Sequence, residues 1–345
     1  MSSQTAKPDT KAIAEDLVNW YQQHARDYPW RRTRDPYAIL VAEVMLQQTQ
    51  IATVLGRGYY ARWLERFPDF LSLATAREDE VLKVWEGLGY YRRARNLQRL
   101  AGEVMGKHAG VFPREPAAIL ALPGIGPYTA GAVASFAFGL AEPIVDGNIS
   151  RVLSRIYNDA TPVDSTAGAK LLWGRSRELV QTTDDPRALN SALMELGQTH
   201  CTPAKPACDI CPVRSHCRTV EPESLPVKHS RQEITTVIER VIFLRTQAGV
   251  LLELETGRRR TGLWKLPALP SVHDEQPPPV LLRMHYGITR YKVTLWVHEP
   301  HALDSAWPDT HRIIPFTELE ATPMPAPYRR ALRELLELGE FKLHA

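Results

Sequence analysis

The chain has little cysteine and no long apolar run. Its four cysteines all fall within residues 201–217, and the rest of the 345-residue chain has none. This distribution argues against a secreted domain stabilised by disulfides along its length. No stretch has the apolar length of a membrane-spanning helix, and residues 1–11 lack the apolar core of a secretory signal. These absences predict a cytoplasmic protein that is not inserted in a membrane.

A strong charge of either sign is also missing, since the formal net charge is only +3. Arginines nevertheless cluster around Trp30, within 26–34, and after a Gly- and Tyr-rich stretch, within 92–99. Such clusters can contact phosphates. Charge alone favours the simpler interpretation, in which both are solvated helix faces.

Hydrophobic periodicity divides the chain into a long helical part and a shorter mixed part. Helical spacing, broken by Pro and Gly, recurs at 11–24, 38–55, 70–84, 92–108, 115–121, 127–139, 148–158, 167–181 and 187–199. Runs of β-branched and aromatic residues predict strands at 236–244, 250–254 and 291–297. A final helix is predicted at 326–338. We therefore predict an all-α region at 1–220, a linker at 221–234 and a smaller α+β domain at 235–345.

The cysteines follow the spacing C-x6-C-x2-C-x5-C, at Cys201, Cys208, Cys211 and Cys217. Four potential thiolates in one short segment predict a metal site, because both zinc and a 4Fe–4S cluster accept four thiolates. Ligand chemistry alone does not separate these two metals. Two disulfides are the alternative, and a reducing compartment argues against them.

The segment LPGIGPYTA, at 122–130, has the composition of a tight turn between two helices. Pro123 ends the preceding helix, Gly124 and Gly126 permit positive φ, and Pro127 suits the first turn of the next helix. Exposed amides at such a turn can bind a phosphate. The segment 115–139 therefore resembles a helix–hairpin–helix DNA-binding motif.

Two carboxylates stand out around this hairpin. Glu43 lies on an otherwise apolar helix, where burial raises the pKa of a carboxyl group and favours its protonated form. Asp146 follows the hairpin by about twenty residues. The structural alternatives are a hydrogen-bonded core glutamate and an aspartate that merely caps the helix at 148–158.

A protonated acid and an anion are the pair that cleavage of an N-glycosidic bond requires. The acid protonates the departing base, while the anion stabilises an oxocarbenium-like sugar. A base in a duplex must also be extruded before it reacts. Gln48 and Tyr90 are candidates to fill the vacated stack.

Together these motifs resemble the MutY-type adenine DNA glycosylases of the endonuclease III superfamily. The supporting stretches are the hairpin, the cysteine loop, LVAEVMLQQTQ at 40–50, WEGLGYYRRAR at 85–95 and VDGN at 145–148. The match covers 15–217 with specific motifs and continues more weakly to about residue 340. It implies a six-helix bundle with a 4Fe–4S cluster on the four cysteines, followed by a Nudix-like lesion-recognition domain.

The resemblance also implies roles for individual residues. Glu43 would protonate adenine and then activate water, and Asp146 would stabilise the oxocarbenium ion, with help from Tyr128 and Asn148. Endonuclease III-like enzymes carry a lysine at position 128 that forms a Schiff base. Tyrosine lacks that chemistry, so a monofunctional glycosylase is implied. We expect a nucleoid-associated monomer that removes adenine opposite 8-oxoguanine or guanine from double-stranded DNA.

Further site residues follow from the same resemblance. The expected DNA contacts are Gln48, Thr49, Leu88, Tyr90, Gly124, Gly126, Thr289 and Arg290. The expected substrate pocket comprises Trp30, Arg31, Leu46, Ile51 and Ser191.

The chain departs from the family pattern at three places. Residues 288–290 read Ile-Thr-Arg where the family usually has Phe-Ser-His, Ser191 replaces a Glu or Gln, and two residues are inserted around 56–58. A glycosylase with shifted preference, such as thymine opposite guanine, is therefore one alternative. A non-catalytic iron–sulfur DNA-binding protein is another, although the presence of both carboxylates argues against it.

Overall fold

The computed structural model describes residues 8–229, 233–257, 260–269, 278–288, 290–300 and 307–337. Contacts divide the chain into two compact units. The first unit consists of Met1–Gln48 and Leu100–Arg231, and the second of Thr49–Arg99 and Gln232–Ala345. Each unit is therefore built from two stretches that are separated in the sequence.

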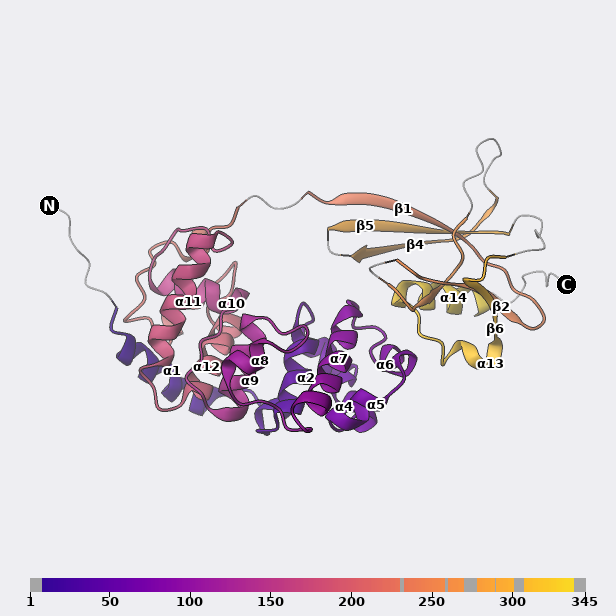
Figure 1. Cartoon of the computed structure of the whole chain (residues 1–345). Helices are drawn as coiled ribbons and strands as arrows, with labels where there is room; N and C mark the ends of the chain where they lie inside the picture. The colour runs from indigo at the N-terminus through magenta and orange to yellow at the C-terminus, as the bar shows by residue number, and fades with distance from the viewer. Residues whose placement is uncertain are drawn as a thin grey trace. The chain divides into compact units, whose positions relative to one another are not determined.

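The first unit is helical (Figure 1). Its elements are α1 (Thr10–His24), η1 (Pro29–Arg31), α2 (Pro36–Leu46), the end of α7 (Arg92–Lys107), α8 (Pro116–Leu120), α9 (Pro127–Phe138), α10 (Gly147–Ile156), α11 (Thr166–Val180), α12 (Pro186–Thr199), η2 (Cys208–Ile210) and η3 (Pro222–Ser224). Helix α1 packs against α11 and α12, α2 packs against α9, and α10 packs against α12. Side-chain oxygens cap the first amides of several helices, which fixes where they start: Asp9, Asp35, Asp146, Ser165 and Asp185.

Helices α2 and α9 form the centre of this unit. Both are apolar around most of their circumference, which is typical of a buried helix rather than a surface one. Gly131 lets α9 approach the chain closely, since a Cβ there would lie 2.3 Å from the carbonyl oxygen of Pro143. This packing holds the residues of both helices at fixed positions in the core.

The second unit combines short helices with two three-stranded sheets. Its helices are α3 (Ile51–Gly56), α4 (Tyr59–Arg66), α5 (Phe70–Thr75), α6 (Glu78–Val84), the start of α7, α13 (Phe316–Leu319) and α14 (Ala326–Glu337). Its strands are β1 (Thr235–Ile242), β2 (Gly249–Leu254), β3 (Trp264–Lys265), β4 (Val280–Ile288), β5 (Tyr291–His298) and β6 (His311–Pro315).

The strand orders are β1-β5-β4 and β3-β2-β6. Strand β1 pairs in parallel with β5, whereas β4 pairs antiparallel with it, and α14 packs against β4 (Figure 1). Apolar side chains of both sheets and of α14 form one core, including Val250, Leu295 and Leu335.

Polar contacts join the helices of the second unit to its strand-containing part. Arg329 on α14 is 6% exposed and donates to both carboxylate oxygens of Glu86, at 2.7 and 3.1 Å. Tyr91 Oη donates to the Met324 carbonyl at 3.2 Å. Segment 49–99 is therefore held to the C-terminal part by buried side chains.

The predicted helical core and a C-terminal α+β part with strands are confirmed, while the predicted domain bounds and the Nudix-like identity of the C-terminal part stay predictions. The prediction of one helix over 38–55 is wrong, because α2 ends at Leu46 and α3 begins at Ile51. The run at 70–84 likewise forms two helices, α5 and α6. Helix α4 and strands β4 and β6 were not predicted. Among the described residues, no helix is both long and apolar enough to cross a bilayer.

Candidate active site

Glu43 is a carboxylate in the centre of the first unit. It lies on α2 with a 4% exposed fraction, and nearly all residues of that helix are buried. Burial raises the pKa of Glu43 to about 7. A hydrogen bond from Tyr128 opposes this shift, the negative charge of Asp146 adds to it, and the charge of Arg31 opposes it. Near neutral pH, Glu43 is thus available as both an acid and a base.

Tyr128, on the first turn of α9, contacts the Glu43 carboxylate directly. Its hydroxyl donates to Glu43 Oε2 at 2.9 Å and lies 3.7 Å from Met194 Sδ. Burial, with the nearby carboxylates, raises the pKa of Tyr128 well above its ordinary value. The phenol therefore stays protonated and acts as a fixed hydrogen-bond donor to the acid.

Asp146 is the N-cap residue of α10, as the structural alternative expected. Its Oδ1 accepts from the Ile149 amide at 2.7 Å, and its Oδ2 accepts from Asn148 Nδ2 at 3.0 Å. These two donors hold the carboxylate in place at the positive end of the helix dipole. Capping and a role as an anion are therefore compatible.

The four predicted catalytic residues interact with one another through hydrogen bonds or through charge. The charge of Asp146 acts on the pKa values of both Glu43 and Tyr128, and Asn148 is bonded to Asp146. Two carboxyl groups in different environments divide into an acid and an anion, which is the division that glycosidic chemistry uses.

Arg151 joins Asn148 to the cysteine loop, a connection that the sequence did not reveal. Its Nη2 donates to Asn148 Oδ1 at 2.9 Å and to the Gly197 carbonyl at 2.6 Å, while its Nε donates to the Cys201 carbonyl at 2.7 Å. A chain of hydrogen bonds thus runs from Asp146 to the loop. The sequence feature that could have indicated this connection is an arginine three residues after Asn148, on a helix that is mostly buried.

Arg155 lies one turn further along α10 and is 1% exposed. Its guanidinium donates to the carbonyls of Thr202 and Leu225 at 2.7 and 3.1 Å, and Nη1 lies 3.4 Å from Cys201 Sγ. A buried cation bonded to several loop carbonyls fixes the course of the loop.

The four cysteines lie in the loop after α12 and are partly buried. Burial, together with the charges of the other three cysteines, raises the pKa of Cys211 to about 11. Within the described residues, no group of three or more His, Cys, Asp or Glu side chains forms a ready metal site. Mutually interacting thiols from one loop still supply the donor set of a four-thiolate group.

Arg31 and Trp30, two of the predicted pocket residues, are held by contacts with Glu195 on α12 and with Tyr28. Arg31 Nη1 forms an ion pair with Glu195, which is 2% exposed. Glu195 Oε1 also accepts from the Arg26 amide at 3.0 Å. Trp30 is 8% exposed and stacks on Tyr28. Glu195 and Met194 are therefore site residues that the sequence analysis missed.

The other three predicted pocket residues are placed by their helix positions and their burial. Ser191 is buried on α12, one turn before Glu195, and Leu46 is the half-buried last residue of α2. Ile51 opens α3 in the second unit.

The predicted hairpin is present between α8 and α9. Gly124 has φ +77°, as expected of a left-handed turn. Gly126 has φ −105° and caps α9, so the positive φ that a glycine permits is not used there. No side chain caps the start of α9, and Pro127 occupies the first helical position, where its missing amide hydrogen costs no helical hydrogen bond.

The other predicted DNA contacts differ in exposure. Gln48 and Tyr90 are exposed and have positive φ values of 59° and 47°, so both present their side chains from tight turns. Thr49 is half-buried. Leu88 is 7% exposed and so offers little surface to a duplex in this conformation.

The predicted lesion-sensing loop joins β4 and β5. Arg290 is exposed, and its guanidinium stacks over the Tyr291 ring at 5.2 Å. Its carbonyl accepts from the Thr235 amide at 2.9 Å. Thr289 lies outside the described residues.

Comparison with known proteins identifies relatives of the first part of the chain. The model of the HhH-GPD superfamily, base excision DNA repair proteins, matches residues 41–174. Human adenine DNA glycosylase is 45% identical over 229 residues, which are 63% of this chain and 41% of that protein. The chain thus spans less than half the length of its mammalian relatives.

Bacterial relatives are covered more completely. The adenine DNA glycosylase of Buchnera aphidicola subsp. Baizongia pistaciae is 36% identical over 74% of this chain and 72% of its own length. The Mycolicibacterium smegmatis adenine DNA glycosylase is 42% identical over 59% of this chain and 68% of its own length.

Solved structures share the fold. A thermostable thymine-DNA glycosylase has a TM-score of 0.56 at 32% identity and covers 61% of this chain and 96% of its own. A DNA complex of endonuclease III has a TM-score of 0.51 at 24% identity, over 63% of this chain and 96% of its own, and supports the fold alone.

Proposed function

Because the chain belongs to the adenine DNA glycosylase family, within the HhH-GPD superfamily, we propose that it hydrolyses the N-glycosidic bond of adenine in double-stranded DNA. The observation that carries the proposal is the buried Glu43–Tyr128 pair, with the Asp146 carboxyl group near enough to act on the pKa of Glu43. The mispair it acts on would place adenine opposite 8-oxoguanine or guanine, and the protein would act as a monomer.

Glu43 supplies the acid for the departing base. With its pKa near 7 it is about half protonated at neutral pH, so it can donate a proton to a ring nitrogen of an extruded adenine. The Tyr128 hydroxyl holds the carboxyl group in one orientation. Once deprotonated, Glu43 can accept a proton from the attacking water.

Asp146 supplies the anion for the sugar. As the C1′–N bond breaks, positive charge develops on the sugar ring, and a carboxylate held by Ile149 and Asn148 stabilises that charge without reorganising. Tyr128 provides no amine for a Schiff base. The protein should therefore release the base without cutting the strand.

The cysteine loop would hold a 4Fe–4S cluster through Cys201, Cys208, Cys211 and Cys217. Bound there, such a group would mainly order the loop, since four thiolates of one segment close around it. Arg151 and Arg155 tie the same loop to α10. Purified protein should contain about four irons and a visible absorption band, whereas stoichiometric zinc without that band would contradict the cluster.

A thymine glycosylase acting opposite guanine is the second candidate. It is favoured by Ser191, which replaces the longer Glu or Gln of the family, and by the likeness to a thymine-DNA glycosylase at 32% identity. The geometry of Glu43 favours adenine, because protonation assists the departure of a purine.

The decisive experiment measures base release from four duplexes, in which adenine or thymine faces 8-oxoguanine or guanine. We expect release of adenine, and loss of at least about a thousandfold in rate for Glu43→Gln and Asp146→Asn with duplex binding retained. Asp27→Asn, an exposed carboxylate paired with Arg32, is the control and should react normally. Undiminished turnover by both active-site variants would refute the proposal.

A further inference from the structure

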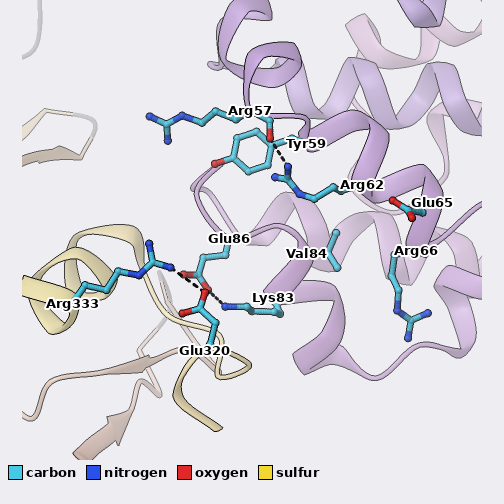
Figure 2. Close-up of a pocket in the computed structure, with 10 residues that line it drawn as sticks. All are labelled: Arg57, Tyr59, Arg62, Glu65, Arg66, Lys83, Val84, Glu86, Glu320 and Arg333. Carbon is cyan, nitrogen blue, oxygen red and sulfur yellow. Dashed lines mark hydrogen bonds and ion pairs between the residues drawn. The ribbon is translucent and has the colours of Figure 1, made fainter. Parts of the chain in front are cut away.

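A hollow of about 750 Å³ lies within the second unit (Figure 2). It is lined by Arg57, Tyr59, Arg62, Glu65, Arg66, Lys83, Val84, Glu86, Glu320 and Arg333. The proposed catalytic chemistry uses none of these residues. The lining carries five cationic and three acidic side chains, which leaves an excess of two positive charges.

Three of the five cations are already neutralised. Arg66 forms an ion pair with Glu80, Lys83 Nζ lies 3.1 Å from Glu86 Oε2, and Arg333 Nη2 lies 3.0 Å from Glu320 Oε1. Each of these three cations thus lies beside a carboxylate, and Glu86 is shared with Arg329.

Arg57 and Arg62 differ from the other three. Arg62 donates to the Arg57 carbonyl and stacks over the Tyr59 ring at 5.1 Å. Neither arginine has an acidic partner among the residues that the structure describes. Glu65 also lacks a cationic partner, but Figure 2 shows it beside Arg66, on the opposite side of the hollow from Arg57. The excess charge is thus concentrated at one wall.

The backbone makes a tight turn at Arg57, between two helices. Arg57 caps the end of α3, and Gly58, with φ +66°, turns the chain into α4. The backbone turn therefore presents Arg57 at the rim of the hollow.

This wall is continuous with the loop that carries Leu88 and Tyr90. A Cβ added at Gly87 would lie 2.1 Å from the Tyr59 hydroxyl, so the ring packs directly against the loop backbone. Arg93 Nη2 donates to the carbonyls of Leu88 and Gly89 at 3.0 and 3.2 Å, which fixes the loop. A DNA strand that follows this loop would next meet Arg62 and Arg57.

We propose that Arg57 and Arg62 form a phosphate-binding site for the backbone of duplex DNA beyond the Leu88–Tyr90 loop. Guanidinium groups without an acidic partner match phosphate oxygens, which accept two parallel N–H donors. A backbone phosphate contact adds affinity that does not depend on sequence and falls with salt. The inference rests on the proposed function in one respect: the phosphate-bearing polymer that binds is taken to be DNA.

The test measures binding of the full-length protein to undamaged duplexes at several salt concentrations. Arg57→Ala and Arg62→Ala should each reduce the salt slope by about 1, and the double variant should bind a duplex of about 30 base pairs roughly tenfold more weakly at low salt.

Arg57→Lys keeps the charge and should retain most of the slope. The matched control is Glu320→Ala/Arg333→Ala, which removes an exposed ion pair from the same hollow without changing the net charge. It should leave both slope and affinity unchanged. Unfolding temperatures of all variants verify that these exposed substitutions preserve the fold.

A second measurement separates DNA from small phosphorylated ligands. Inorganic phosphate and pyrophosphate are titrated calorimetrically into wild type and the Arg57→Ala/Arg62→Ala variant. Weak or absent binding, together with the reduced DNA slope, supports the proposal. Tight phosphate binding with an unchanged DNA slope would instead assign the site to a free anion, and no difference in either measurement would refute it. The binding test uses undamaged DNA and therefore does not depend on base release. Failure of the proposed glycosylase function would be detected separately, in the base-release assay.

Discussion

At the scale of the residue, Glu43 is an unfavourable choice for stability. Its side chain lies among apolar neighbours on α2, and its charged form is disfavoured by burial and by Asp146. A neutral residue of similar size would fit this position at lower cost. The presence of a carboxyl group here is therefore best explained by its chemistry.

The pKa of Glu43 predicts the pH dependence of base release. The acid form donates the proton, so activity should be highest below pH 7 and fall about tenfold per pH unit above it. Tyr128→Phe removes the hydrogen bond that stabilises the carboxylate, so the pKa of Glu43 should rise and the decline should move to higher pH. A single-turnover pH profile measures both. A decline that starts near pH 4.5 in the wild type would contradict a buried acid.

The same titration affects folding. A carboxyl group whose pKa is raised from 4.5 to about 7 releases its proton more readily in the unfolded chain, so stability is lost as pH rises through this range. Glu43→Gln should therefore raise the free energy of unfolding at pH 8 by up to about 3 kcal/mol and change it little at pH 4. Denaturant titrations at the two pH values measure this, and equal effects at both would contradict it.

At the scale of the element, the position of Asn148 depends on how closely α12 approaches α10. A Cβ at Gly197 would lie 2.7 Å from Asn148 Cβ and 3.2 Å from its backbone. Gly197→Ala should displace Asn148 from Asp146, slow base release at least about tenfold and cost about 1–3 kcal/mol of stability.

Gly174 on α11 provides the matched control. A Cβ there meets nothing within 4 Å, so Gly174→Ala should leave the rate unchanged and stabilise the helix by up to about 1 kcal/mol. If Gly197→Ala reacted as fast as this control, the packing of α12 against α10 would have no part in holding the site.

Local motifs predicted which residues form the site better than they predicted which of these residues contact one another. Glu43, Tyr128, Asp146 and Asn148 each stand in a short recognisable stretch, and the structure brings them together. Glu195 pairs with Arg31 across 164 residues, and nothing in either segment alone marks the partner. Such pairs depend on tertiary packing.

The break between α2 and α3 also escaped prediction. Residues 47–50 are all polar but contain neither Gly nor Pro, and apolar residues at helical spacing resume at Ile51, so the sequence does not mark an end of the helix there. The chain nevertheless turns there, with Gln48 at φ +59°. A positive φ at a non-glycine residue is strained, and the exposed Gln48 side chain at this turn fits the DNA contact predicted for it.

At the scale of the whole molecule, the sequence predicted two consecutive domains, whereas the contacts define two interleaved units. The buried pair of Glu86 and Arg329 is central to the second unit. Arg329 also donates to the carbonyls of Leu319 and Thr322, so one side chain connects α14, the end of α13 and the segment after α6.

Loss of Arg329 should therefore weaken the second unit. Arg329→Met leaves Glu86 with Lys83 as its remaining cation and should cost about 2–4 kcal/mol in urea unfolding. Hydrogen exchange should accelerate in α13 and α14. Arg333→Ala, which breaks an exposed pair on the same helix, should cost less than about 1 kcal/mol. Equal effects of the two substitutions would show that burial of the Glu86 pair contributes nothing.

The discontinuous second unit has a consequence for biosynthesis. Tyr91 and Glu86 find their partners 233 and 243 residues later in the chain. At ordinary translation speeds, roughly ten to fifty seconds separate the appearance of the two halves at the ribosome. Segment 49–99 must wait through that interval with its docking side chains uncovered, which makes the nascent chain a natural client for chaperones.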